Sequence, residues 1–329
     1  GVKYSLAVNA GTAALHLALR YAGVLKGDYV LCSSLTFAAS CNPILYLGGI
    51  PVLVDSDRKS WNMSPRALEK AVNWGKKNGI TYKAAVIVDL YGQPAEYDEL
   101  LAILKKEKIA VVEDAAEAMG AVYKGKKCGT FGDYAAFSFN SNKVITAGGG
   151  GMVVSDQKEA VEKMRYWSSQ AREPLPYYEH KDYGYQYRMS NILAGIGCAQ
   201  VKYIDRYVKL RRNIYLEYKR ALQDAPVTMM PLLADARPNC WLTVVTLDRR
   251  YDPLALIEYL EEFNIESRMV WKPMHLQPVF AECGFYSVRE KGSLAEDVFN
   301  SGLCLPSDIK NTAEDMDKII GIVKGLFGK

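Results

Sequence analysis

Short apolar segments alternate with helical stretches through the first half of this chain, and that order most constrains its fold. Segments rich in Val, Ile and Ala predict strands over 5–8, 29–32, 52–54, 84–88, 110–113, 134–139 and 152–154. They show little apolar–polar alternation, which is typical of strands buried on both faces. Because strands that alternate with helices form a mostly parallel sheet covered by helices, we expect an α/β fold.

Two helix starts are indicated by capping residues. Ser64 precedes Pro65, a pair that caps and opens a helix running toward Trp74. Thr12 is the predicted N-cap of the first helix, because Leu15 and later apolar residues follow at helical spacing.

The pattern changes after about residue 157. A helical stretch over 158–169 leads into a long loop over 172–190 that is rich in Tyr, charged residues and Pro, and a long helix is predicted over about 192–222. A strand over 241–247, a helix over 253–263, a short strand over 265–269 and a terminal helix over 313–326 follow. We expect residues 1–205 to form a large domain and residues 206–329 a smaller α+β domain, since 329 residues suffice for two.

The composition excludes several classes of protein. Hydrophobic residues make up 49% and charged residues 24% of the chain, a globular balance that disordered and collagen-like proteins lack. The net charge of +4 is too small to favour a nucleic-acid partner. No apolar run reaches the roughly 18–20 residues that span a membrane, and no basic-plus-apolar leader opens the chain.

The cysteines are scattered rather than paired. There are 7 of them, and the sequence holds no Cys-x-x-Cys motif. This spacing favours reduced thiols in a cytoplasmic protein over a disulfide framework or a zinc site. We therefore expect a cytoplasmic protein without a bound metal.

Acidic residues end the predicted strand over 110–113. Glu113 is its last residue and Asp114 follows directly. Carboxylates at the C-terminal edge of a parallel strand face the crevice in which α/β sheets bind ligands. The alternative is that Asp114 only caps a helix, because Ala115 and Ala116 come next.

Lys143 follows the predicted strand over 134–139 and precedes the glycines at 148–151. A lysine in such a loop is either a solvated surface residue or a nucleophile. The glycine run differs from a dinucleotide-binding fingerprint because a strand, not a helix, follows it. The sequence therefore disfavours a nicotinamide-dependent enzyme.

The junction Asn9-Ala10-Gly11-Thr12 joins a predicted strand to a helix through small residues. Backbone N–H groups at a helix N-terminus bind phosphate well. Asp114 could bind a pyridine nitrogen, Lys143 an aldehyde and Phe37 the face of a ring. Together these groups are the binding set of pyridoxal 5'-phosphate.

The order of the motifs resembles that of one family. Gly-Thr-Ala-Ala-Leu at 11–15 precedes Glu-Asp-Ala-Ala-Glu at 113–117, the segment from 129 to Lys143, the glycine run and Gly-Tyr-Gln-Tyr-Arg-Met-Ser-Asn at 184–191. This order resembles the DegT/DnrJ/EryC1/StrS family of nucleotide-sugar aminotransferases over nearly the whole chain. The resemblance implies the aspartate aminotransferase-like architecture, fold type I, with a mostly parallel seven-stranded sheet in the large domain and a smaller C-terminal α+β domain.

The resemblance also implies roles for single residues. Lys143 matches the lysine that forms the Schiff base with the cofactor, and Asp114 matches the acid on the pyridine nitrogen. The other implied cofactor contacts are Gly11, Thr12 and Ser138 at the phosphate, Phe37 and Glu117 at the ring, and Asn191 at the phosphate in the neighbouring subunit.

Within the family, the chain is similar to enzymes that aminate UDP-4-keto-6-deoxy-N-acetylglucosamine on the bacillosamine route. This similarity rests on the stretches 170–173, 178–180, 182–191 and 271–275, and on Gly149 where many members carry Glu. It implies a UDP-linked keto sugar, glutamate as amino donor and a homodimer with shared active sites. The residues expected to contact substrate are Arg172, His180, Tyr183, Arg188 and His275.

Other functions stay open on the sequence alone. One is amination at C3 or C4 of a dTDP- or GDP-linked keto sugar, since the choice of UDP and of the N-acetyl group rests on the resemblance. Another is a cofactor-binding regulator without turnover. Dehydratases of the family carry His at the position of Lys143, which argues against that activity.

Overall fold

The strands expected in the first half of the chain are present in this computed structural model, which describes residues 1–328. They are β1 (Tyr4–Val8), β2 (Tyr29–Ser33), β3 (Ile50–Val54), β4 (Tyr82–Val88), β5 (Ala110–Asp114), β8 (Tyr134–Ser138) and β9 (Gly151–Ser155). They join in the order β1-β9-β8-β5-β4-β2-β3. Among these strands of the described chain, only β9 is antiparallel to the strands on both of its sides. The other pairings are parallel, so the expected mostly parallel sheet is confirmed.

A further strand from the C-terminal part of the chain extends this sheet. β14 (Gly284–Tyr286) pairs in parallel with β3, and Phe285 lies opposite Leu53. Over residues 1–328 the sheet therefore has eight strands where seven were expected. Residues 284–286 are Gly-Phe-Tyr and lack the Val, Ile and Ala that indicated the other strands, so only the tertiary structure defines this one.

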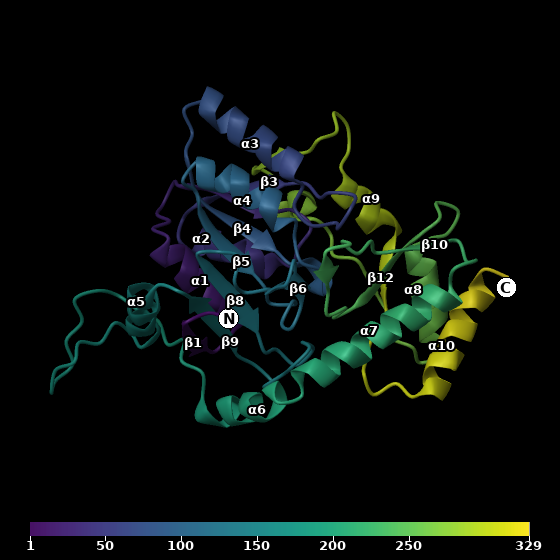
Figure 1. Ribbon diagram of the computed structural model, residues 1–329. Helices are drawn as coiled ribbons and strands as arrows, with labels where there is room; N and C mark the ends of the chain where they lie inside the picture. The colour runs from purple at the N-terminus through teal and green to yellow at the C-terminus, as the bar shows by residue number, and fades with distance from the viewer. Residues whose placement is uncertain (329) are drawn as a thin grey trace.

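Helices cover both faces of the large sheet (Figure 1). α1 (Gly11–Tyr21), α2 (Asn42–Tyr46) and α5 (Lys158–Ser168) lie on one face, and α3 (Pro65–Lys77) and α4 (Tyr97–Lys106) on the other. Val86 of β4 packs in the core under α1, α2 and α5, and its neighbour Ile87 packs in the core under α3 and α4. Because both faces of the strand are buried, the strands lack apolar–polar alternation. Ser64 caps α3 as predicted, because its side chain accepts a hydrogen bond from the Ala67 N–H.

The predicted long helix over 192–222 consists of two helices. α6 (Asn191–Val201) ends before a short turn, and α7 (Ile204–Ala221) continues toward the second sheet at an angle to it (Figure 1). The break lets Ile204 and Val208 pack against the core beside Gly120, whose φ is +83°. Apolar residues on both sides of the turn gave one continuous helical pattern in the sequence.

The C-terminal part of the chain forms a smaller α+β unit, as expected. Its antiparallel sheet has the order β10-β12-β15-β13, made of β10 (Val227–Met229), β12 (Thr243–Leu247), β15 (Gly302–Leu305) and β13 (Arg268–Met269). α8 (Pro253–Glu261), α9 (Leu294–Ser301) and α10 (Ala313–Leu326) pack around it, and α7 links it to the large sheet. The division of the chain after residue 205 stays a prediction.

The remaining elements are short. A small sheet joins β6 (Val122–Tyr123), β7 (Lys126–Lys127) and β11 (Ala236–Arg237). Single turns of 3-10 helix are η1 (Ala38–Ser40), η2 (Leu90–Gly92), η3 (Met274–Leu276) and η4 (Pro278–Phe280). Among the helices of residues 1–328, none combines the length and the apolar character that crossing a membrane requires.

Candidate active site

A cleft of about 1350 Å³ opens where the parallel strands of the large sheet end. β5 ends at Asp114, β8 ends at Ser138, and β1 leads through a short turn into α1 at Gly11. All three residues line the cleft, together with Phe37 after β2 and Lys143 after β8. The topology thus brings the residues that the sequence singled out to one edge of the sheet, where α/β folds bind ligands.

The N-terminus of α1 forms one end of this cleft. The helix begins at Gly11, after Ala10 in extended conformation, and its first residues are uncharged. Thr12 is therefore not the N-cap, as the sequence had suggested, but the second residue of the helix, and it lines the cleft. A Cβ atom on Gly11 would lie only 3.0 Å from the Ser138 Cβ, so the glycine keeps the helix end open beside Ser138. The free N–H groups of the first turn suit a phosphate.

Asp114 lies buried beside this helix end, with 5% of its surface exposed. Its Oδ2 accepts a hydrogen bond of 2.6 Å from the Ser40 hydroxyl, and its Oδ1 accepts one of 3.2 Å from the Ala116 N–H. Turns rather than a helix follow β5, so the alternative of a helix cap is wrong. Burial raises the pKa of Asp114, while the Ser40 and Ala116 hydrogen bonds and the charge of Lys143 act in the opposite direction.

Lys143 reaches into the cleft instead of into solvent. Its side chain is 12% exposed, and its Nζ lies 3.4 Å from the Glu117 Oε1. The same nitrogen lies 3.9 Å from the centre of the Trp241 ring. The alternative of a solvated loop lysine is therefore wrong.

Glu117 is buried between the lysine and the backbone of η2. Its Oε2 accepts a hydrogen bond of 2.7 Å from the Tyr91 N–H. Burial raises the pKa of Glu117 to about 7, the nearby Asp114 charge adds to the rise, and Lys143 opposes it. This carboxyl can therefore exchange a proton near neutral pH, next to the amine of Lys143.

Asn239 and Tyr91 support the position of Glu117. The Asn239 side-chain amide donates hydrogen bonds to the Glu117 carbonyl at 2.7 Å and to the Met119 carbonyl at 3.0 Å. Tyr91, which donates its N–H to Glu117, has a φ of +53°, and the next residue, Gly92, has a φ of +87°. Left-handed backbone at a non-glycine residue is typical of functional sites, but the sequence carries no pattern that indicates it.

An aromatic wall of Trp241, Trp271 and Phe37 lines the other side of the cleft, and the buried Tyr91 packs against its two indoles. The ring centroids of Tyr91 and Trp271 are 4.6 Å apart, and those of Tyr91 and Trp241 are 6.2 Å apart. Phe37 lies at the mouth, 56% exposed and 5.7 Å from the Trp271 ring. Of this group, Phe37 was assigned to the cofactor ring from the resemblance.

Four of the residues expected to contact substrate lie away from the cleft of their own chain. Residues 172–190, which we call the arm, extend past α5 as an irregular loop (Figure 1). In the arm, the Arg172 guanidinium lies 4.3 Å from the centre of the Tyr178 ring, and the His180 Nδ1 lies 2.9 Å from the Gln170 carbonyl oxygen. The Arg20 guanidinium lies 3.9 Å from the centre of the Tyr183 ring. Arg188 pairs with Val8 at the end of β1, and Asn191 begins α6. Neither these residues nor Asn191 is among those that line the cleft of the described chain.

His275 is not among the residues that line the cleft of the described chain. Its Nδ1 lies 2.6 Å from the Ser34 hydroxyl and its Nε2 lies 3.1 Å from the Glu296 Oε1. The Phe285 ring stacks on the imidazole at 3.7 Å between ring centroids, and only 7% of the side chain is exposed. The expectation that His275 contacts substrate does not fit this geometry, because its neighbours enclose the ring.

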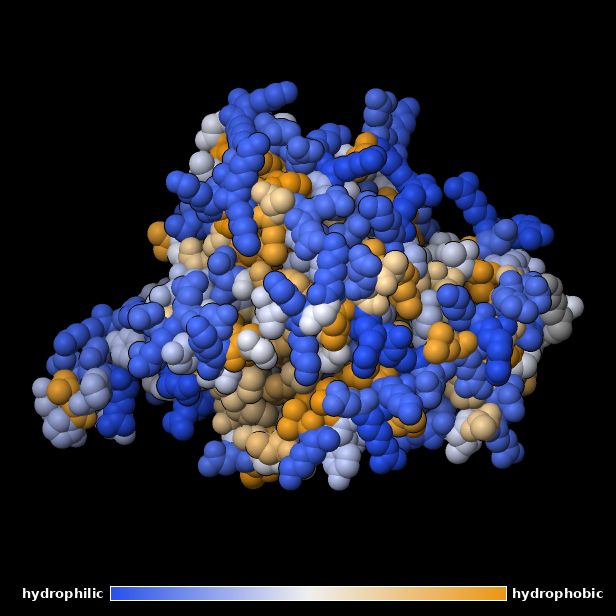
Figure 2. Space-filling view, viewed as in Figure 1, coloured by the Kyte–Doolittle hydropathy of each residue, from blue (hydrophilic) through white to orange (hydrophobic). Residues whose placement is uncertain are grey.

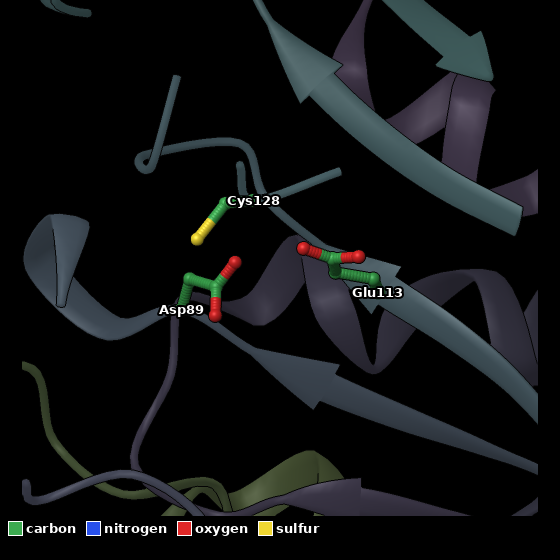
Figure 3. Close-up of side chains that lie close together, drawn as sticks. All are labelled: Asp89, Glu113 and Cys128. Atoms are coloured by element: carbon green, nitrogen blue, oxygen red, sulfur yellow. The ribbon is translucent and has the colours of Figure 1, made fainter. Parts of the chain in front are cut away.

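A second buried cluster joins Asp89, Glu113 and Cys128 (Figure 3). Its three ligand atoms lie within 4.8 Å of one another, a spacing that a metal could bridge. The oxygens of Glu113, however, already accept hydrogen bonds from the N–H groups of Gly129, Phe131 and Gly132. Burial and the charge of Glu113 raise the pKa of Asp89, which favours the protonated form of Asp89 beside Glu113.

Known proteins match this chain over almost its full length. Residues 1–324 match the DegT/DnrJ/EryC1/StrS aminotransferase family. EpsN of Bacillus subtilis, which carries the name of a pyridoxal phosphate-dependent aminotransferase, is 48% identical over 328 residues, covering 99% of this chain and 84% of EpsN. A GDP-perosamine synthase of Caulobacter vibrioides is 37% identical over 324 residues, covering 97% of this chain and 85% of that protein.

The similarity extends to solved structures. The crystal structure of a DegT DnrJ EryC1 StrS aminotransferase from Brucella abortus has a TM-score of 0.92 against this chain at 30% identity. The match covers 100% of this chain and 87% of the Brucella chain. Sequence and fold therefore point to the same set of relatives.

Proposed function

The chain belongs to the DegT/DnrJ/EryC1/StrS aminotransferase family, and we propose that it transfers an amino group from glutamate to the C4 ketone of a UDP-4-keto-6-deoxy-N-acetylhexosamine. It is a pyridoxal phosphate-dependent sugar aminotransferase with the fold-type-I architecture. The meeting of Lys143, Glu117 and Asp114 in one cleft carries the amino-transfer part of the proposal. The choice of a UDP-linked 4-keto sugar rests on the resemblance of the stretches 170–173, 178–180, 182–191 and 271–275.

The residues of the cleft fit the cofactor. The open helix end at Gly11 and Thr12, with Ser138 beside it, would hold the phosphate. Asp114 would bind the ring nitrogen, and that nitrogen's positive charge would favour the ionised carboxylate against the effect of burial. Phe37 and Glu117 would flank the ring.

Lys143 is the residue that we assign to catalysis. When bound, pyridoxal phosphate supplies an aldehyde that exchanges amino groups and a ring that takes up electrons. Lys143 would hold that aldehyde covalently through Nζ and, once released, carry a proton to or from the substrate carbon with the same nitrogen. Glu117, 3.4 Å from Nζ, would accept or return a proton at this position.

A test of this assignment uses the Lys143→Ala variant and reduction with borohydride. The wild-type protein should retain the cofactor covalently on the peptide that contains Lys143, and the variant should lose it. A reduced cofactor found on another lysine would contradict the assignment. Glutamate should bleach the visible band of the wild-type protein, and a band that persists would favour a binding protein without turnover.

We propose that the active protein is a homodimer with shared active sites. α6 is apolar yet exposed, with Ile192 at 78% and Ile196 at 44% exposure. Figure 2 shows hydrophobic side chains gathered over the position of α6. Exposed apolar patches of this kind mark interfaces between proteins.

The arm and Asn191 flank this patch. If a second subunit docked on α6, the arm and Asn191 of each subunit would approach the cleft of the other. Asn191 would then contact the partner's cofactor phosphate, and Arg172, His180, Tyr183 and Arg188 would contact its substrate. Mixing Asn191→Ala subunits with Lys143→Ala subunits should restore part of the activity, since one of the two sites in a mixed dimer is intact. A fully active monomer would contradict the proposal.

The choice of nucleotide and carbon is tested with a panel of keto sugars. Glutamate-loaded enzyme is offered UDP-, dTDP- and GDP-linked 4-keto sugars, and the new amine is located by NMR. The proposal expects amination at C4 of the UDP sugar. Amination only at C3, or of the dTDP sugar alone, would refute this substrate without refuting the transaminase.

A GDP-linked 4-keto sugar is the second candidate substrate. The 37% identity to a GDP-perosamine synthase over 97% of this chain favours it. A preference for the GDP sugar in the panel would select this function. In either case we propose a cytoplasmic enzyme, because the 7 cysteines all carry free thiols within the described residues.

A further inference from the structure

We propose that Trp241 is a positioning residue for Lys143: the face of its indole ring holds the lysine ammonium whenever the lysine is not bound to the cofactor. This inference rests on the proposed role of Lys143. It concerns a residue that lies 98 positions further along the chain, just before β12 of the smaller α+β unit.

The ammonium of Lys143 sits between an indole face and a carboxylate. Its Nζ is 3.9 Å from the centre of the Trp241 ring, well within the range of a cation–π interaction. The Glu117 Oε1 lies at 3.4 Å, longer than a strong charge-assisted hydrogen bond. The indole face is therefore a main support of the amine in the described chain.

The indole itself is held rigidly. Its Nε1–H donates a hydrogen bond of 2.6 Å to the carbonyl of Asn142, the residue before Lys143. Its backbone N–H donates to the Asn239 Oδ1 at 2.9 Å, and its carbonyl accepts from the Arg211 Nη1 at 2.7 Å. Only 2% of Trp241 is exposed. Because these contacts already fix the ring, the indole loses no further conformational entropy when its face binds the lysine ammonium.

The indole holds the cation under conditions in which Glu117 does not. Burial raises the pKa of Glu117 to about 7, so this carboxyl loses its charge as the pH falls through neutrality. An indole face attracts an ammonium at any pH, and it offers the ammonium's proton no acceptor. Trp241 thus holds the ammonium of a released Lys143 in place whether or not Glu117 is protonated, and the ionised Glu117 is the group that can take a proton from it before the amine acts as a base.

This arrangement favours release of the lysine. During exchange with the cofactor bound, the donor nitrogen would replace the lysine nitrogen on the aldehyde carbon, so one C=N bond would form and one would break. The C=N nitrogen would carry one proton before and after, so the donor ammonium would give up two protons to the lysine, which would leave as an ammonium toward the indole face. If the lysine instead bound the free aldehyde, its ammonium would keep one proton on the new C=N nitrogen, and the other two would leave with the aldehyde oxygen as water. Stabilising the released ammonium therefore promotes donor binding and weakens covalent retention of the cofactor.

The test compares Trp241→Leu with Trp241→Phe. The Leu variant removes the aromatic face and the indole N–H, whereas the Phe variant keeps a face and loses the N–H. Trp271→Leu is the matched control, since it removes an indole that packs on Tyr91 in the same aromatic wall. Thermal unfolding first confirms that each variant is folded.

Two constants are measured for each variant. One is the dissociation constant of pyridoxal phosphate from equilibrium dialysis with the apoenzyme, and the other is the glutamate concentration that half-saturates bleaching of the cofactor band. In Trp241→Leu the half-saturating glutamate concentration should rise about threefold to tenfold, while the cofactor dissociation constant should fall by a similar factor. Trp241→Phe should lie closer to wild type in both.

A rise in the half-saturating glutamate concentration together with a fall in the cofactor dissociation constant distinguishes this role from a loosened site. A loosened site would raise both values. In the Lys143→Ala background, Trp241→Leu should leave the cofactor dissociation constant unchanged. Equal weakening in Trp241→Leu and Trp271→Leu, or equal effects of Leu and Phe at position 241, would overturn the inference. If borohydride labels another lysine in the wild-type protein, the proposed role of Lys143 fails instead.

Discussion

Replacing Glu117 by Gln should change how the stability of the apoenzyme depends on pH. The substitution keeps the shape of the side chain and an oxygen that can accept the Tyr91 N–H, but it removes the titrating carboxyl. Burial and the neighbouring Asp114 raise the pKa of Glu117 in the folded protein from 4.5 to about 7. In the unfolded chain the same group titrates near its ordinary value.

The sign and size of the effect follow from this difference. A carboxyl with a raised pKa stabilises the folded state while it is protonated, so its contribution is complete below pH 4.5 and is lost as the pH rises to about 7. The rise corresponds to about 3 kcal/mol in the free energy of unfolding. Relative to Glu117→Gln, the wild-type apoenzyme should therefore lose about 3 kcal/mol of stability between these two pH values.

Urea unfolding of both apoproteins, repeated from pH 4.5 to pH 8, measures this difference directly. The other buried carboxyls, Asp89 and Glu113 among them, are present in both proteins, so their contributions cancel. Removing the opposing charge with Lys143→Met should extend the loss to higher pH. A difference between wild type and Glu117→Gln that stays constant over the whole range would refute the reasoning.

Three further substitutions test other parts of the site. Asp114→Asn should slow the half-reaction with glutamate by at least about hundredfold, since a lost buried charge partner costs about 3–5 kcal/mol; stopped-flow rates near those of wild type would leave Asp114 without a role at the ring. Gly11→Ala should raise the cofactor dissociation constant about tenfold, because the new methyl group would lie 3.0 Å from the Ser138 Cβ; unchanged equilibrium dialysis would place the phosphate elsewhere. Gly92→Ala should lower the free energy of unfolding by about 2–3 kcal/mol, because its φ is +87° and the added Cβ would lie 1.8 Å from the Asn239 Oδ1; wild-type stability in urea would show that this turn relaxes freely.

Much of the large sheet and the central part of the site could be predicted from the sequence. Buried parallel strands are short, apolar and rich in β-branched residues, so each produces a local pattern. The chain direction then places whatever follows a strand at one edge of the sheet. For this reason Asp114 and Lys143 could be placed after strands of one sheet before their distances were known, and the family resemblance added Ser138.

The sequence was less informative where a residue acts through a partner far along the chain. Trp241 and Asn239 reach Lys143 and Glu117 across about a hundred residues, and neither lies in a motif with a recognisable spacing. The left-handed backbone at Tyr91 depends on the turn after β4, which the sequence does not encode by a glycine at that position. His275 was assigned to the substrate on its sequence context, but its packing with Ser34 and Glu296 encloses it.

Sequence by itself determined which elements form and which chemical groups stand at their ends, because hydrophobic periodicity and chain direction are local properties. Only the tertiary structure decided the environment of those groups. The pKa of Glu117, the indole face over Lys143 and the position of the arm outside its own cleft depend on burial and on contacts between distant segments. Such contacts follow from how the two sheets and α7 pack together, and that packing is a property of the whole chain.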